Sequence, residues 1–304
     1  MDGIINVYKE AGFTSHDVVA KLRGICRQKK IGHTGTLDPQ ATGVLPVCLG
    51  SATRACEMLT DRTKEYMAEL LLGKITDTQD TTGTVLEERE VAVDEAQVRE
   101  VIGSFVGGYD QIPPMYSALK VNGKKLYELA RAGKEVERQA RHVDLPAIEI
   151  LEIRLPVVKF RVECSKGTYI RSLCADIGGK LGCGGTMQSL VRTRVGEFRL
   201  TDALTLTQLQ ELRDTGRLEE ALLPTDRIFA DFNAVHVEEK WRKLIDNGNA
   251  FYPGQTMEQT TYPVGEWVRV YREDDSFVGI YAYDGAKEWY KPVKIFHSNT
   301  ESRK

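Results

Sequence analysis

The chain has 304 residues, 41% hydrophobic and 28% charged, which suits a globular protein of one large domain or two smaller ones. No apolar run approaches the roughly 20 residues that a membrane span needs, and the first residues lack a signal peptide pattern, so we expect a cytoplasmic protein without membrane association. The six cysteines form no C-x-x-C pair and no histidines are spaced as in H-E-x-x-H, which predicts reduced thiols and no metal site.

Helix and strand patterns alternate along the first 230 residues. Residues 14–25 begin with a capping sequence and carry apolar side chains at helical spacing, as do residues 94–105 and 205–216. Residues 64–72 and 158–164 alternate apolar and polar side chains, which is typical of half-buried strands. This order predicts a large mixed sheet flanked by helices.

The sequence GHTGTLDPQATG, residues 32–43, places one acidic residue, Asp38, in a loop of glycines and threonines. Pro39 favours an extended backbone at Asp38, and the glycines let a ligand approach closely. The loop lacks the Walker phosphate-loop pattern and the dinucleotide fingerprint. The residues alone leave two alternatives, a turn-forming aspartate and a catalytic carboxylate.

A catalytic carboxylate that a substrate covers needs a neighbouring cation to stay ionised. Arg171, which follows Tyr169 where a strand pattern passes into a helix pattern, is the best candidate. A structural or phosphate-binding arginine is an equally acceptable interpretation of this position.

The net charge of −3 is unevenly distributed. Residues 111–200 contain 16 basic and 9 acidic residues, whereas residues 61–110 contain 5 and 12. A basic segment in an acidic protein indicates either a polyanion-binding face or a solvated surface.

The pattern changes near residue 230 to short strands separated by turns. We expect residues 231–304 to form a small all-β module, and its last residues, SNTESRK, to be frayed.

Five stretches together resemble the TruB family of tRNA pseudouridine synthases. They occur in the family's order over roughly residues 4–195: GHTGTLDPQATGVLPVCLGSATR, RTKEYMAELLLG, TDTQDTTG, QIPPMYSALKVNGKKLYELARAG and GTYIRSLCADIGGKLGCGG. The resemblance implies an α+β pseudouridine synthase fold with a large, mixed, mainly antiparallel sheet as catalytic domain 1–230, which includes an RNA-gripping insertion at about 108–141. The C-terminal module, 231–304, resembles the RNA-binding PUA barrel more loosely.

The resemblance also implies a reaction and its residues. Uridine 55 in the T loop of tRNA would be flipped out and isomerised to pseudouridine, without metal or cofactor. Asp38 matches the catalytic aspartate, Arg171 its partner, and Tyr66 the tyrosine that stacks on the uracil. Substrate-binding roles are implied for His33, Lys9, Asp80, Tyr169 and Leu190, and RNA contacts for Lys120, Lys124, Lys125, Arg131 and Arg141. Glu10 stands where the family commonly has proline.

Alternative functions remain open at this point. A tRNA-folding chaperone without essential catalysis would use the same binding surface. A glycoside hydrolase normally needs two carboxylates, and the loop offers one; Asp176, at helical spacing beyond Arg171, is interpreted as a surface or capping residue. The resemblance favours a monomer that acts without a guide RNA, since long Lys-rich tails are missing.

Overall fold

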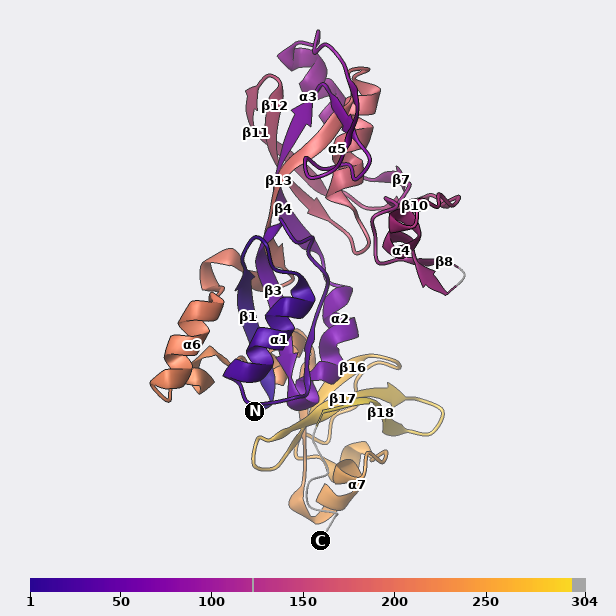
Figure 1. Ribbon diagram of the computed structural model, residues 1–304. Helices are drawn as coiled ribbons and strands as arrows, with labels where there is room; N and C mark the ends of the chain where they lie inside the picture. The colour runs from indigo at the N-terminus through magenta and orange to yellow at the C-terminus, as the bar shows by residue number, and fades with distance from the viewer. Residues whose placement is uncertain (122, 297–304) are drawn as a thin grey trace.

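The computed structural model describes residues 1–121 and 123–296. The expected frayed end, residues 298–304, lies outside these ranges. The described chain forms an upper part with helices α3 and α5, a middle part with α1, α2 and α6, and a lower C-terminal part (Figure 1). No helix in the described ranges is long and apolar enough to cross a membrane.

One large sheet runs through the upper and middle parts. Its strand order is β1-β3-β13-β4-β12-β11, with β2 paired to β3 and β14 to β13. All of its pairs are antiparallel except β13–β3, which is parallel and joins only Val191 to Thr42 and Arg192 to Gly43. The strands are β1 (Gly3–Lys9), β2 (Ile31–His33), β3 (Thr42–Leu49), β4 (Lys64–Leu72), β11 (Ala147–Arg154), β12 (Val157–Cys164), β13 (Gly185–Val195) and β14 (Phe198–Arg199). This confirms the predicted α+β class with a large, mainly antiparallel sheet.

The helices form where the sequence provides caps and apolar faces. Thr14, Asp94 and Thr205 each accept a hydrogen bond from a backbone N–H in the first turn, as their capping sequences predict. The α-helices are α1 (Ser15–Ile25), α2 (Cys56–Thr60), α3 (Glu95–Gly103), α4 (Leu126–Arg131), α5 (Ile170–Lys180), α6 (Leu206–Asp214) and α7 (Arg242–Asp246). Short 3-10 helices cover Gly50–Ala55, Leu200–Asp202, Leu218–Ala221, Thr225–Phe229, Glu239–Trp241 and Pro253–Gln255.

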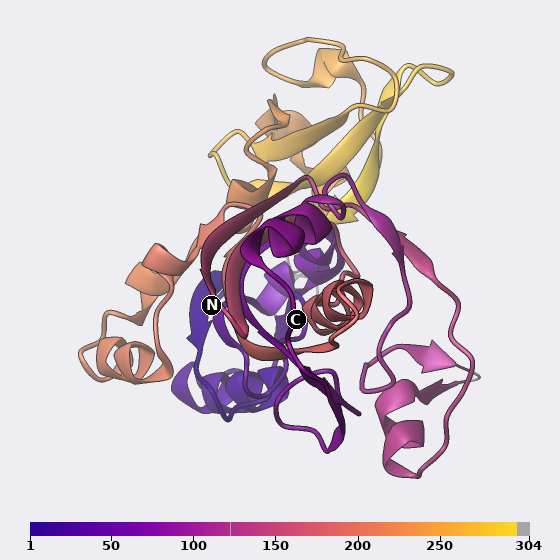
Figure 2. The same cartoon turned by 90° about the horizontal axis from the view of Figure 1, so that it is seen from above.

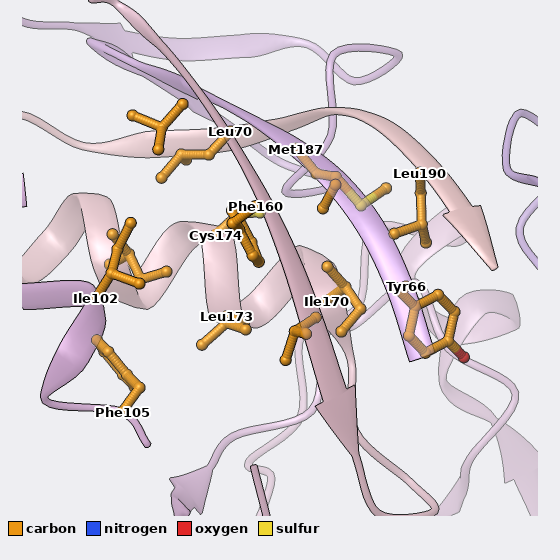
Figure 3. Packing of buried hydrophobic residues seen from close by; sticks show 14 of the residues in the cluster. Tyr66, Leu70, Ile102, Phe105, Phe160, Ile170, Leu173, Cys174, Met187 and Leu190 are labelled. Carbon is orange, nitrogen blue, oxygen red and sulfur yellow. The ribbon is translucent and has the colours of Figure 1, made fainter. Parts of the chain in front are cut away.

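Two hydrophobic cores lie on the large sheet in the upper and middle parts. In the upper core, α5 and α3 pack on β4, β12 and β13, with Phe160, Leu173 and Ile102 buried between them (Figure 3). In the middle core, α1 and α6 cover β1 and β3 through Val18, Leu22 and Leu209. Since full burial of such side chains contributes about 1.5–3 kcal/mol each, these cores hold the sheet in one shape.

Two smaller elements project from this body. The hairpin β5 (Lys74–Thr76) and β6 (Val85–Glu88) follows β4. The insertion is held at its base by β7 (Tyr109–Gln111) and β10 (Arg141–Val143), and carries the hairpin β8 (Lys120–Val121) and β9 (Lys124–Lys125) with α4. Figure 2 shows that it extends away from the rest of the molecule.

The C-terminal module is a four-stranded sheet in the order β15-β16-β17-β18. Its strands are β15 (Asn233–Val237), β16 (Trp267–Arg272), β17 (Phe277–Asp284) and β18 (Trp289–Ile295). One expectation is corrected, because the module includes the helix α7. The part that was expected to be a PUA-like barrel is a four-stranded sheet, and its edge strands β15 and β18 are both bridged to residues 251–256, at Val237–Thr256 and Phe251–Tyr290. Ile280 and Phe296 are buried with Ile4 and Phe229 of the preceding domain, so the module shares a core with it.

Candidate active site

The Asp38 carboxylate is gripped on both oxygens by one arginine. Arg171 Nε lies 2.8 Å from Asp38 Oδ2, and Arg171 Nη2 donates to Asp38 Oδ1 at 3.1 Å. The arginine side chain is only 5% exposed, whereas 36% of the aspartate side chain is exposed. Such a two-point contact fixes the plane of the carboxylate while leaving part of it accessible.

Backbone carbonyls hold Arg171 in place. Its Nη1 donates to Thr78 O at 3.0 Å and its Nη2 to Tyr116 O at 2.8 Å. Thr78 belongs to the β5–β6 hairpin and Tyr116 to the insertion, so three separate segments meet at one guanidinium. The predicted pairing of Arg171 with Asp38 is present in the structure, which leaves the role of the pair to be tested.

Asp80, for which the resemblance implied a substrate-binding role, forms a turn and lies near Arg171. Its Oδ1 accepts hydrogen bonds from the backbone and hydroxyl of Thr82 and from the Thr78 hydroxyl, which is a turn-forming arrangement. Its Oδ2 lies 4.0 Å from Arg171 Nε, within ion-pair range. Asp80 therefore adds negative charge behind the guanidinium that holds Asp38.

Hydrogen bonds with neighbouring segments hold the loop that carries Asp38 in place. Leu37 N–H donates to the buried Ser15 hydroxyl at 3.0 Å, and Gly12 N–H donates to Pro39 O at 2.9 Å. Lys9 Nζ donates to Pro39 O at 2.9 Å and also to the carbonyls of Glu10 and Phe13. The sequence alone did not identify Ser15, because a serine in the first turn of a helix is usually read as part of a cap.

Lys9 corrects an expectation. It was predicted to bind substrate, but its side chain is fully buried and its ammonium group is surrounded by three carbonyls. Burial lowers its pKa to about 8, and the charge of Asp38 works against that lowering. The lysine therefore stays charged at neutral pH, and its place beneath the loop excludes direct contact with a substrate.

One wall beside Asp38 is aromatic and apolar. Tyr66 and Leu190 pack in the same cluster as Leu37. In Figure 3, Tyr66 closes one end of the cluster next to Leu190, and its hydroxyl oxygen points away from the other labelled side chains. Burial raises the pKa of Tyr66, so its hydroxyl keeps its proton at neutral pH. Tyr66 and Leu190 are both buried, 9% and 8% exposed, and make this side of the site aromatic and apolar.

Tyr169 is fixed next to Arg171 by the insertion. Its backbone N–H donates to Gln111 Oε1 at 2.8 Å, and Gln111 Nε2 donates to Tyr169 O at 3.0 Å. Burial raises the pKa of the Tyr169 hydroxyl, whereas a hydrogen bond with Ser117 lowers it. Asp176, predicted to be a surface or capping residue, is instead half-buried and accepts a hydrogen bond from Tyr109.

His33 lies at the start of the Asp38 loop and faces a separate hollow. This hollow has a volume of about 460 Å³ and is lined by His16, His33, Cys56 and the basic residues Arg23, Lys29 and Lys30. Burial lowers the pKa of His33 to about 4, helped by His16 and Arg192, so the ring is neutral at pH 7. The basic residues around this hollow were not predicted from the sequence, because they are spread over α1 and the turn that follows it.

The predicted RNA-binding residues are spread over the insertion. Lys120, Lys124, Arg131 and Arg141 are exposed, and Lys125 is half-buried. Lys125 and Arg131 lie over the Tyr127 ring, 5.4 Å and 5.5 Å from its centre. Leu126, the first residue of α4, is buried and anchors this helix.

Comparisons with known proteins identify the family of the chain. A model of the TruB family pseudouridylate synthase N-terminal domain matches residues 23–170, and one of the tRNA pseudouridylate synthase B C-terminal domain matches residues 171–230. The chain is 53% identical over 306 residues to tRNA pseudouridine synthase B of Lachnoclostridium phytofermentans, covering 97% of this chain and all of that protein.

The chain belongs to the TruB family of pseudouridylate synthases. It is 49% identical to tRNA pseudouridine synthase B of Alkaliphilus oremlandii, with 97% of both chains covered. Membership of this family makes the protein a pseudouridine synthase, and confirms the resemblance on which the expected activity rested.

Solved structures support the fold. A chain from an H/ACA RNP bound to a substrate RNA containing 2′-deoxyuridine has a TM-score of 0.73 and 26% identity, over 98% of this chain and 86% of that one. A chain of a Cbf5-Nop10-Gar1 complex has a TM-score of 0.73 and 28% identity, over 98% and 85%. In the described residues no group of His, Cys, Asp or Glu side chains could hold a metal ion.

Proposed function

We propose that the protein isomerises uridine 55 in the T loop of tRNA to pseudouridine, with Asp38 as the catalytic carboxylate. The observation that carries this proposal is the Asp38–Arg171 pair, in which a buried guanidinium fixes both oxygens of a carboxylate that remains accessible. Relatives named tRNA pseudouridine synthase B, up to 53% identical over nearly the full chain, support tRNA as the substrate.

The reaction needs no group beyond those in the site. The N1–C1′ bond breaks, the uracil turns, and a C5–C1′ bond forms; C5 loses its proton and N1 gains one. An ionised Asp38 can attack the ribose or the base, or take a proton, and each of these roles requires the orientation that Arg171 supplies. We propose that the reaction uses neither a metal ion nor an organic cofactor.

The wall beside Asp38 suits a flipped-out nucleotide. The atoms C1′ and C5 are inaccessible in a stacked loop, so the target base has to leave the stack. Tyr66 would stack on the uracil and Leu190 would pack against it, with Tyr169 and Asp80 on the Arg171 side. His33, neutral and at the edge of a basic hollow, would contact the neighbouring extruded nucleotides.

Direct gripping of tRNA fits the arrangement of charges. The exposed cations of the insertion, Lys120, Lys124, Arg131 and Arg141, together with Lys125, would contact phosphates. We propose that residues 1–230 form the catalytic domain, that residues 231–304 form a second RNA-binding module, and that the protein acts in the cytoplasm as a monomer without a guide RNA.

The test uses an unmodified tRNA transcript labelled with tritium at uridine C5. Wild-type protein is expected to release tritium to water and to form pseudouridine at position 55, mapped by carbodiimide treatment and primer extension. Asp38→Asn should release none while still binding the transcript. Asp61→Asn, an exposed carboxylate that pairs with Lys166, is the matched control and should match wild type.

Three results would contradict the proposal. Tight tRNA binding without tritium release would indicate a folding chaperone. Free uracil would indicate hydrolysis. Pseudouridine at another position would overturn the assignment of uridine 55.

A further inference from the structure

Arg192 is a buried arginine next to the active site that the mechanism above does not use. It lies in β13 and is 1% exposed, among the largest fully buried side chains. Its backbone is paired on one side with Gly43 of β3 and on the other with Tyr66 of β4. Arg192 therefore lies between the strand that leaves the Asp38 loop and the strand that carries Tyr66.

The guanidinium of Arg192 holds both ends of the Asp38 loop. Its Nε donates to Val44 O at 2.7 Å, and its Nη2 donates to Gly35 O at 3.2 Å. Gly35 precedes Asp38 by three residues, and Val44 follows it by six. One rigid planar group thus sets the distance between the two ends of the segment that presents the carboxylate.

The same guanidinium acts electrostatically on Tyr66, which lies opposite Arg192 in the neighbouring strand β4. The positive charge of Arg192 lowers the Tyr66 pKa, opposing the larger effect of burial. Arg192 thus binds the Asp38 loop and lies beside the strand that carries the tyrosine of the opposite wall.

The charge of Arg192 has no local counterpart. Among the described residues, no carboxylate forms an ion pair with the Arg192 guanidinium within 4.0 Å. The charge of Arg192 also contributes to lowering the pKa of the neighbouring Lys9 and Lys64. A buried cation without a carboxylate is costly, and apolar packing would stabilise a strand better. The position is therefore better explained by function than by stability.

We propose that Arg192 is a positioning residue for the isomerisation, which holds Asp38 and Tyr66 in one fixed arrangement on either side of the flipped uracil. This inference rests on the proposed function. Arg192 acts through its neighbours, because its burial leaves no surface for contact with RNA. A lysine cannot span the two carbonyls, since its single ammonium group lacks the planar fork.

The test compares Arg192→Lys and Arg192→Gln with wild type under single-turnover conditions, with tRNA affinity measured separately by filter binding. Both variants should bind tRNA within about threefold of wild type, because they alter no exposed group. Their rate of pseudouridine formation should fall by at least about 30-fold, since a misplacement of about 1 Å in an active site costs on the order of 100-fold. Two variants are compared so that, if one of them fails to fold, the rate of the other still tests the proposal.

Arg194 provides the matched control. It lies two residues further along the same strand and pairs with Glu163 at 2.9 Å. Arg194→Lys should form pseudouridine at a rate within about twofold of wild type, because a substitution away from the site has little effect.

A double-mutant comparison separates positioning from general support of the fold. If Arg192 acts partly through the Tyr66 hydroxyl, Arg192→Lys should cost less in a Tyr66→Phe background than in wild type. Equal losses in both backgrounds would contradict the Tyr66 part. Folded Arg192 variants with wild-type rates, or with rate losses explained by weaker tRNA binding, would overturn the inference. An inactive wild type would instead overturn the proposed function and this inference with it.

Discussion

At the scale of single residues, the site depends on the hydrogen bonds that the guanidinium of Arg171 donates. Arg171 reaches two carboxylate oxygens and two carbonyls, and lies near a second carboxylate, Asp80. Each hydrogen bond to a charged group contributes about 1.5–3 kcal/mol, and a buried carbonyl left without its donor costs about 1–3 kcal/mol. Loss of this arginine would therefore remove the partner of Asp38 and leave two carbonyls without their donor.

Arg171→Lys tests this dependence. Lysine keeps the charge but provides a single donor point, so the carboxylate can rotate, and at least one of the carbonyls of Thr78 and Tyr116 loses its partner. We expect a fall of about 100-fold or more in the single-turnover rate. Arg161→Lys, at an exposed pair with Glu149, is the control and should leave the rate unchanged. A wild-type rate for Arg171→Lys would contradict the positioning role.

His33 gives a prediction about stability and pH. Its pKa is about 4 in the folded chain, against an ordinary value of 6.5, because it is buried near His16 and Arg192. Between these values an unfolded His33 binds a proton and the folded one does not, so falling pH favours unfolding. Above pH 6.5 this contribution to stability is fully present.

We therefore expect the wild-type melting temperature to fall more steeply between pH 6.5 and 4 than that of His33→Gln. Thermal unfolding followed by circular dichroism across this range provides the measurement. His142→Gln, at an exposed histidine, is the control and should keep the wild-type slope. Identical slopes in wild type and His33→Gln would show that His33 titrates normally.

At the scale of elements, the Asp38 loop and β3 meet β13 through a glycine. Gly43 has φ +105°, and a Cβ atom there would lie 2.2 Å from Arg192 O. Gly12 also has a positive φ, +85°, but a Cβ atom there meets nothing within 4 Å. The two glycines separate the cost of backbone conformation from the cost of a clash between strands.

Gly12→Ala should cost about 1–2 kcal/mol of unfolding free energy, the usual penalty for a left-handed backbone. Gly43→Ala should cost more than Gly12→Ala, because the added methyl group forces β3 away from β13. Urea unfolding of both variants measures the difference. Equal costs would mean that the strands separate without strain, against the close packing seen here.

The sequence predicted those elements whose signal is local. Capping residues fixed the starts of α1, α3 and α6, and alternation identified β4 and β12, because both depend on side chains near in the chain. Asp38 and Arg171 were associated through the need of a carboxylate for a cation, and through the family resemblance. Their contact spans 133 positions and could not be derived from spacing.

The remaining site residues escaped prediction for physical reasons. The family resemblance implied a substrate-binding role for Lys9, and nothing in the sequence shows that three carbonyls surround its ammonium group. Arg192 had a detectable signal, since it occupies an inward position on a strand in line with Leu190, a place that a strand pattern gives to apolar residues. The bridges that join residues 251–256 to both edges of the C-terminal sheet could not be predicted, because strand patterns do not show how the edges of a sheet are paired.

At the scale of the whole molecule, several exposed cations lie on the insertion. The insertion extends from the body on the short β7–β10 pair and carries Lys120, Lys124 and Arg131 (Figure 2). The segment 201–304 instead contains 13 basic and 18 acidic residues. RNA affinity should therefore depend on the insertion more than on the C-terminal module.

Replacing Lys120, Lys124 and Arg131 by glutamine tests this division. Each lost phosphate contact should reduce the slope of log Kd against log salt concentration by about 0.7–0.9. The rate at saturating protein should stay near wild type. Glutamine at Lys240 and Lys243 is the matched change in the C-terminal module and should leave the slope unchanged; the opposite pattern would move the main binding surface there.

The parallel contact between β13 and β3 has a mechanical consequence. It consists of two residue pairs, and among the described strands it is the ladder that joins the β1-β3 half of the sheet to the β13-β4-β12-β11 half. So short a ladder leaves most of the joint to side chains, because Ile4 and Val44 of one half share a buried cluster with Val195 and Phe198 of the other. The Asp38 loop ends at this joint, so a change that loosens this packing should be transmitted along β3 to the carboxylate.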